Sequence, residues 1–97
     1  MKFEWDENKR LINSQRHGFD FVGVETVFEN VRYTILDNRF DYGETRFVTF
    51  GFLRGRVVTV VHTATDNDVI RIISVRKATK NEQRKFYKTI ADELGEN

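Results

Sequence analysis

The sequence predicts an α+β fold in which helices pack against a mostly antiparallel β-sheet. The apolar spacing changes near residue 32 from a helical period to a period of two, and short connections join the four alternating stretches that follow. A chain of 97 residues also has material for one hydrophobic core only. We therefore expect a single domain over residues 1–97, in the order strand, helix, helix, four strands, helix.

The first two elements are indicated by a short alternation and by helix-end signals. Phe3-Glu4-Trp5 alternates apolar and polar side chains and predicts a short strand. Asp6 is a suitable N-cap, and the polar helix that follows is expected to run to His17, where Gly18 ends it.

A second helix is predicted to begin at Asp20. Gly23 lies inside this segment and weakens its helix propensity by about 1 kcal/mol. The apolar side chains recur at helical spacing and should face the core: Phe21, Val24, Val27 and Phe28.

Four strands and a last helix complete the prediction. The strands are expected at residues 33–36, 46–52, 57–63 and 69–75, and their connections are short enough for antiparallel hairpins. Thr79-Lys80-Asn81-Glu82 is a capping box, so a helix should begin there. Its apolar side chains are four residues apart, at Phe86, Ile90 and Leu94, and Gly95 is expected to end it.

Composition excludes several classes of protein. Nine Phe, three Tyr and one Trp are too many aromatic residues for a disordered chain. The absence of Cys excludes disulfides and thiolate zinc sites. Because no apolar run approaches the roughly 20 residues that cross a bilayer, and no signal sequence opens the chain, we expect a cytoplasmic protein without membrane contact.

The net charge of +1 hides an uneven distribution. Residues 54–88 contain nine basic and three acidic residues, a net charge of +6, whereas residues 1–53 and 89–97 carry −2 and −3. Such a concentration indicates either a polyanion partner or a solvated basic face.

Metal and nucleotide-cofactor sites are not predicted. The chain has two His, far apart, and its acidic residues are scattered. Asp37, Arg39 and Asp41 have calcium-loop spacing, but Tyr42 stands where the turn needs Gly. The six Gly form no phosphate-binding pattern, so we expect no cofactor.

A basic group remains, in which His62 ends one strand, Arg71 lies within the next, and Arg76-Lys77 follows. Strand alternation places His62 on the same side as Val58 and Val60, where it is either a packed ring or a catalyst. Arg71 interrupts an apolar strand and must reach solvent, an acid or a ligand. We interpret His17 as a residue that caps the last carbonyls of the first helix.

Over residues 3–87 the chain resembles the BrnT family of type II toxins. The similar stretches include Phe3-Glu4-Trp5-Asp6, His17-Gly18 and Val60-Val61-His62-Thr63. The most specific stretch is Ile70-Arg71-Ile72-Ile73-Ser74-Val75-Arg76-Lys77-Ala78-Thr79, followed by Glu82. Val75 stands where the family often has Ala.

The resemblance implies a compact RelE-like ribonuclease fold and a toxin that inhibits translation. It also implies neutralisation by a ribbon-helix-helix antitoxin similar to BrnA, with operator DNA contacted only through that antitoxin. We expect the antitoxin to cover the basic face formed by residues 71–88.

The mechanism that we expect from this resemblance is RNA cleavage without metal, in which the RNA supplies its own 2′-hydroxyl as nucleophile. Arg71 and Arg76 are expected to bind phosphate, and His62 to act as acid or base. Lys77 and Lys80 would guide the RNA backbone, and Arg46 would also contribute. The general base stays open, because RelE-like enzymes can use Lys or Glu instead of His.

Strict alternation would place Arg71 and Arg76 on opposite sides of the sheet, because they are five positions apart. We therefore predict a bulge near Ser74-Val75 that turns Arg76 toward His62. Two other functions stay open: an RNA-binding module without catalysis, and a protein-interaction module with a basic face.

Overall fold

In the part of the chain that the structure describes, the protein forms a five-stranded sheet with three helices. The computed structural model describes residues 1–63 and 66–95. The elements follow in the order β1 (Lys2–Glu4), α1 (Glu7–His17), α2 (Glu25–Glu29), β2 (Arg32–Asp37), β3 (Arg46–Leu53), β4 (Arg56–Thr63), a short 3-10 turn (Asp66–Asp68), β5 (Val69–Lys77) and α3 (Lys80–Glu93). The sheet order is β1-β5-β4-β3-β2, with β1 parallel to β5 and the other pairs antiparallel. The predicted α+β class and element order are confirmed.

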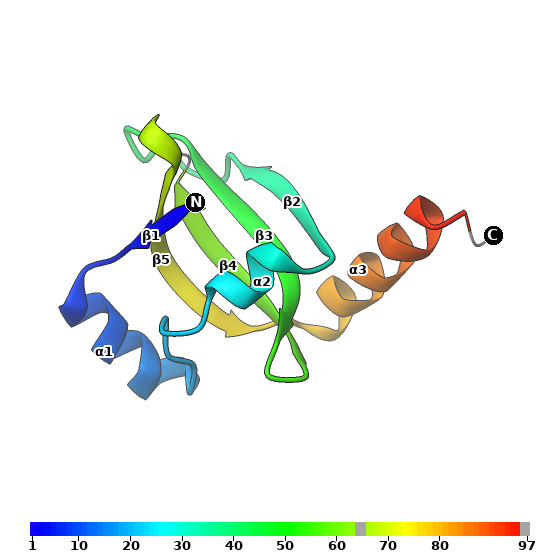
Figure 1. The fold of residues 1–97 in the computed structure, drawn as a ribbon, viewed down its shortest axis with the longest axis horizontal. Coiled ribbons are helices and arrows are strands. Elements are labelled where there is room, and N and C mark those ends of the chain that lie inside the picture. Colours follow the sequence, from blue (N-terminus) through cyan, green and yellow to red (C-terminus); the bar gives the residue numbers. More distant parts are fainter. Residues whose placement is uncertain (64–65, 96–97) are drawn as a thin grey trace.

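The two faces of the sheet carry separate apolar clusters. On the α2 face, strand residues such as Val58, Val60 and Ile72 pack against the segment that contains α2. On the α3 face, Val48, Phe50 and Val57 pack with Phe86 of α3. Figure 1 shows α2 lying across β3 and β4, and α3 projecting away from the sheet, which accounts for a longest dimension of 43 Å. Part of the α3 face is therefore left uncovered.

A bulge interrupts the pairing of β5 with β4. Val61 pairs with Ser74, but His62 pairs with Ile72, so Ile73 has no partner on β4. The bulge lies one residue before the predicted Ser74-Val75, and β5 continues beyond the expected end to Lys77. The extra residue reverses the alternation, and Arg71 and Arg76 consequently share the α3 face.

Helix α1 protects the edge of β5 where the short β1 no longer covers it. The amide of Asn13 accepts a hydrogen bond from Val75 N (3.1 Å) and donates to Val75 O (2.8 Å) and to Phe19 O (2.9 Å). This buried side chain replaces a strand partner and fixes α1 against β5.

The predicted second helix is shorter than expected. Only Glu25–Glu29 form α2, because Gly23 has φ +94°, which a right-handed helix cannot include. Asp20 caps a turn instead: its carboxylate accepts from Val22 N at 2.9 Å and from Arg10. The four predicted apolar residues are nevertheless all buried: Phe21, Val24, Val27 and Phe28.

The remaining helix signals act as predicted. Asp6 accepts from Lys9 N and caps α1, which runs to His17. The capping box of α3 has both of its hydrogen bonds, Thr79 Oγ1 accepting from Glu82 N and Glu82 accepting from Thr79 N. At Gly51 the sheet approaches α2 closely: a Cβ there would lie 2.8 Å from Val27 Cγ1. Among the described residues, none of the helices has the length and apolar character required to cross a bilayer.

Asn13→Ala should lower the free energy of unfolding by about 2 to 4 kcal/mol, because Val75 N and Val75 O lose their partner at a buried edge and Phe19 O keeps only the longer hydrogen bond from Ser14. Urea denaturation measures the change. Ser14→Ala is the control, since Ser14 makes one 3.3 Å hydrogen bond to Phe19 O and should cost less than about 1 kcal/mol. Equal losses in the two variants would contradict this account of the edge.

Candidate active site

A cleft of about 470 Å³ opens on the uncovered part of the α3 face. It lies between the end of α1, the end of β2 with the residues after it, and the start of α3. We call it the Arg76 cleft. Its polar lining residues are His17, Asp37, Asn38, Arg39, Thr59, Ser74, Arg76 and Glu82.

Arg76 forms a bidentate salt bridge with Glu82 in the cleft. Its Nη1 and Nη2 donate to the two carboxylate oxygens at 2.8 and 2.9 Å, and Nη1 also donates to Lys77 O. The guanidinium has five N–H groups, so part of its donor capacity remains for a phosphate. Glu82 also accepts from Thr59 Oγ1 and caps α3, so Arg76 is oriented by a fixed carboxylate.

The Arg76 guanidinium lowers the pKa of Glu82 to about 2, with further contributions from the hydrogen bonds of Thr79 N and Thr59. At neutral pH Glu82 is therefore ionised and a poor proton acceptor. Its role in the cleft is to position Arg76.

A second arginine is fixed in the same way at the opposite wall. Arg39 donates through Nε and Nη2 to the carboxylate of Asp37 at 2.9 and 3.0 Å, and Tyr42 donates its hydroxyl to the same carboxylate at 3.2 Å. The Asp37 side chain is buried, and the Arg39 guanidinium lowers the pKa of that carboxyl. Arg39 itself is exposed and can meet an anion in the cleft.

His17, at the end of α1, lines the cleft together with Ser74 and Arg76. The sequence interpretation gave this residue only a helix-capping role. The reason is structural: Asn13 lies one helical turn before His17, and a helix fixed to β5 through Asn13 carries His17 toward the same strand. Long-range contacts of this kind are not visible in local sequence patterns.

Arg46 and Arg71 form a second cationic group on the α3 face. Arg71 Nη2 donates to both oxygens of Glu44, at 2.5 and 2.6 Å, and Arg46 Nη2 lies 3.7 Å from the same carboxylate. Arg71 thus reaches both an acid and solvent, as predicted. Without the bulged residue, Arg71 and Arg76 are four strand positions apart, a distance of about 13 Å along β5. The two arginines would therefore contact different phosphates.

The prediction that the bulge turns Arg76 toward His62 is wrong. His62 is buried on the α2 face, with its ring 5.0 Å from the Phe28 ring and 6.0 Å from the Phe47 ring. Its Nδ1–H donates to Thr63 O at 3.2 Å, so Nε2 accepts from Thr49 Oγ1 at 2.7 Å. Burial lowers the pKa of His62 and favours the neutral ring. The alternation puts His62 beside Val58 and Val60, as predicted, but on the side of the sheet away from the arginines.

The two predicted backbone-guiding lysines lie outside the cleft lining. The register pairs Lys77 with Val58, so Lys77 is on the α2 side at the end of β5, where it borders a shallow hollow with Arg56 and Tyr87. Lys80 is exposed at the first position of α3.

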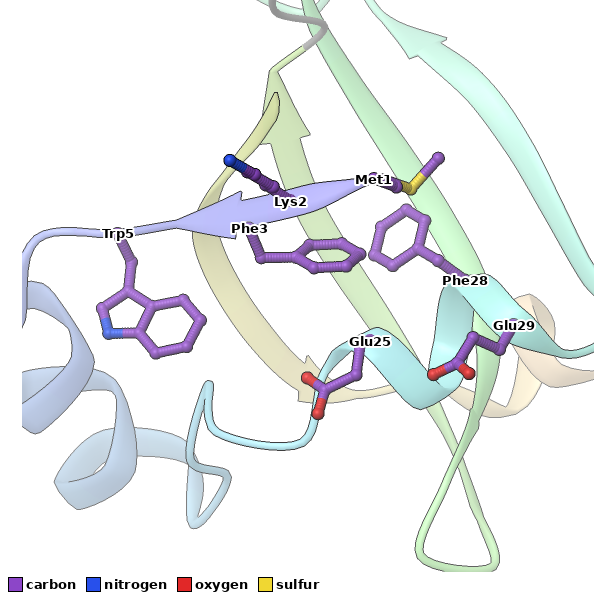
Figure 2. Close-up of a pocket in the computed structure, with 7 residues that line it drawn as sticks. All are labelled: Met1, Lys2, Phe3, Trp5, Glu25, Phe28 and Glu29. Atoms are coloured by element: carbon purple, nitrogen blue, oxygen red, sulfur yellow. The ribbon is translucent and has the colours of Figure 1, made fainter. Parts of the chain in front are cut away.

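A larger hollow, of about 790 Å³, lies between β1 and α2. Figure 2 shows the rings of Phe3 and Phe28 side by side in it, with the carboxylates of Glu25 and Glu29 along α2. The lining is mostly apolar, and its ionisable side chains are two glutamates and Lys2. Size alone favours this hollow, but the Arg76 cleft holds the imidazole and guanidinium groups that phosphate chemistry uses, and we place the candidate active site there. In residues 1–63 and 66–95, His, Asp and Glu side chains form no cluster of three that could hold a metal ion.

Comparisons with known proteins agree with the fold. The family model described as ribonuclease toxin, BrnT, of type II toxin–antitoxin system matches residues 5–82, which include every residue of the Arg76 cleft. The crystal structure of the Brucella abortus ribonuclease toxin BrnT is similar over 82% of this chain and 99% of that chain, with 25% sequence identity and a TM-score of 0.62. A search among curated proteins finds no match.

The Arg76–Glu82 pair should give the protein a pH-dependent stability. The pKa of Glu82 is lowered from 4.5 to about 2 on folding, so the unfolded chain takes up its proton first as the pH falls. The stabilisation is therefore complete above about pH 4.5 and is lost between pH 4.5 and 2. Glu82→Gln should lower the free energy of unfolding by about 1 to 2 kcal/mol at pH 7, and the gap from the unsubstituted protein should close over that interval.

Urea denaturation at several pH values from 7 to 3 measures this gap. Glu93→Gln, at the exposed end of α3, serves as the control and should leave the free energy of unfolding nearly unchanged throughout. A gap for Glu82→Gln that is the same at pH 7 and pH 3 would show that the Glu82 charge does not stabilise the fold.

Proposed function

This chain belongs to the BrnT family of ribonuclease toxins of type II toxin–antitoxin systems, and we propose that it cuts RNA in the Arg76 cleft without a metal ion. The observation that carries the proposal is the cleft itself, because His17 and Arg76 both line it. These are the two kinds of group that RNA cleavage by its own 2′-hydroxyl requires, a proton-transfer group and a phosphate-binding cation.

In the proposed reaction the 2′-hydroxyl oxygen attacks the adjacent phosphorus and loses its proton. The bond from phosphorus to the 5′-oxygen breaks, and that oxygen takes up a proton as it leaves. The products are a 2′,3′-cyclic phosphate and a free 5′-hydroxyl. Arg76 binds the non-bridging phosphate oxygens, whose negative charge increases as the fifth bond forms.

His17 is the proposed proton-transfer group, because imidazole exchanges protons readily near neutral pH and this ring lines the cleft. Glu82 and Asp37 are positioning residues that hold Arg76 and Arg39. Arg46 and Arg71 are proposed to bind RNA phosphates beyond the cleaved bond, since they lie on the same face. Lys77 and Lys80 are proposed to attract the RNA backbone from outside the cleft.

As a member of a toxin–antitoxin family, the chain has an antitoxin partner as well as an RNA substrate. We propose that the antitoxin is a ribbon-helix-helix protein similar to BrnA, that it binds operator DNA for the complex, and that both partners act in the cytoplasm. It would neutralise the toxin by covering residues 71–88 beside the cleft. The exposed cations of this surface, among them Lys80, Arg84 and Lys88, fit an acidic segment of such a partner.

Digestion of RNA in excess EDTA tests the reaction directly. The purified chain should still cut RNA and leave 2′,3′-cyclic phosphate ends, detectable by mass spectrometry. Activity that stops with EDTA and returns with magnesium would contradict the metal-free mechanism. RNA that is bound but stays intact under both conditions would favour an RNA-binding module without catalysis.

Substitution of each histidine in turn distinguishes a catalytic ring from a packed one. His17→Asn should lower kcat/KM at least tenfold, a loss of about 1.4 kcal/mol of transition-state stabilisation, with little change in Tm. His62→Gln should lower the Tm by several degrees, because it disturbs a buried ring, and should leave kcat/KM of the folded protein nearly unchanged. The opposite pattern would place the proton-transfer group on the α2 face.

A further inference from the structure

An aromatic side chain stands open to solvent on the loop between β2 and β3. Phe40 is 69% exposed, although burial of a Phe ring is among the larger apolar gains in folding. The loop is at the rim of the Arg76 cleft, because the two residues before Phe40, Asn38 and Arg39, line that cleft. The ring is therefore available to a ligand that enters the cleft.

The ring belongs to an ordered stack. The Phe40 and Tyr42 rings meet edge to face, with their centroids 5.8 Å apart, and the guanidinium carbon of Arg46 lies 4.0 Å from the centroid of Tyr42. The Tyr42 hydroxyl donates to the buried Asp37 carboxylate, which is also held by Arg39. The base of the stack is thus fixed to the wall of the cleft, and Phe40 is its outer, uncovered member.

Three arginines lie near this ring, each beside a carboxylate: Arg39 beside Asp37, and Arg46 and Arg71 beside Glu44. Arg39 is next to Phe40 in the chain, and Arg46 lies behind Tyr42 and shares Glu44 with Arg71. A ligand that combines flat apolar rings with negative charge matches an exposed aromatic ring among arginines. In single-stranded RNA each nucleotide offers both, a base with an open face and a phosphate.

We propose that Phe40 is a stacking site for an unpaired nucleobase beside the cleaved phosphodiester, so that the substrate is single-stranded RNA. In a duplex, both faces of each internal base are covered by neighbouring bases, and such a base cannot stack on Phe40. The stack would hold the strand across the rim while Arg76 binds the reacting phosphate. This inference rests on the proposed function, because it assigns the class of substrate to the Arg76 cleft.

To test the stacking site at Phe40, RNA binding and RNA cleavage are measured separately. The probe for binding is a fluorescein-labelled single-stranded RNA decamer with 2′-O-methyl riboses, which lacks the attacking hydroxyl and stays intact. Phe40→Ala should weaken its binding at least tenfold, and Phe40→Trp should preserve it. The indole introduced by Phe40→Trp should also lose fluorescence when the probe binds, because a base stacks on it.

The control is Leu94→Ala. Leu94 is also 69% exposed but lies at the far end of α3, so this variant should bind the decamer like the unsubstituted protein. A duplex probe of the same length should bind equally to the unsubstituted protein and to Phe40→Ala. In cleavage assays, Phe40→Ala should raise KM and change kcat less than threefold, because Phe40 does not touch the reacting atoms.

Several outcomes would overturn the stacking site: unchanged decamer binding by Phe40→Ala, or an equal loss for the duplex. Intact RNA binding together with lost antitoxin binding would make Phe40 an anchor for a protein and would also overturn it. If the unsubstituted protein fails to cut RNA while Phe40→Ala still loses the decamer selectively, the stacking site stands and the cleavage mechanism fails.

Discussion

The single extra residue in β5 determines which side chains reach the α3 face of the sheet. In an uninterrupted strand, Ile72 and Val75 would point to opposite sides, and one of them would leave the core. The bulge at Ile73 keeps both in the α2-face cluster and places Arg71 and Arg76 together on the α3 face. Asn13 then binds the backbone of Val75 just after the bulge and brings the end of α1, with His17, to the same cleft. Core packing and site geometry therefore depend on one register shift.

The arginines of this face are oriented by carboxylates before any ligand binds. Glu82 holds Arg76, Asp37 holds Arg39, and Glu44 holds Arg71. Such pairs fix long side chains in position and so reduce the conformational entropy that is lost on binding. They also lower the net charge of the face, so RNA affinity should depend more on matching donor positions than on overall charge. This arrangement suits an enzyme better than a nonspecific polyanion-binding surface.

Local signals in the sequence predicted most of the fold. The capping box at Thr79, the N-cap at Asp6 and the period-two stretches are short-range features, and each forms the expected element. The separation of Arg71 and Arg76 by five positions also predicted a bulge in β5, within one residue of the observed position. The length of helix α2 was overestimated because apolar spacing does not reveal that Gly23 adopts a positive φ.

The site was harder to predict, because a strand pattern tells which residues share a side of the sheet but not which side is covered. The sequence therefore indicated His62 as the acid or base although α2 covers its ring, and it indicated His17 as a helix cap, because the position of α1 against β5 depends on the contact of Asn13 with Val75.

We infer that RNA meets the α3 face of the sheet and not the α2 face. The chain has two histidines, one on each side, so their ring signals report which face the ligand contacts. The most direct measurement is an NMR titration of the imidazole resonances with a 2′-O-methyl single-stranded RNA that cannot be cut. We expect the His17 ring resonances to shift in proportion to bound RNA while those of His62 stay in place. Shifts confined to His62 would contradict it and would move the active site to the opposite face.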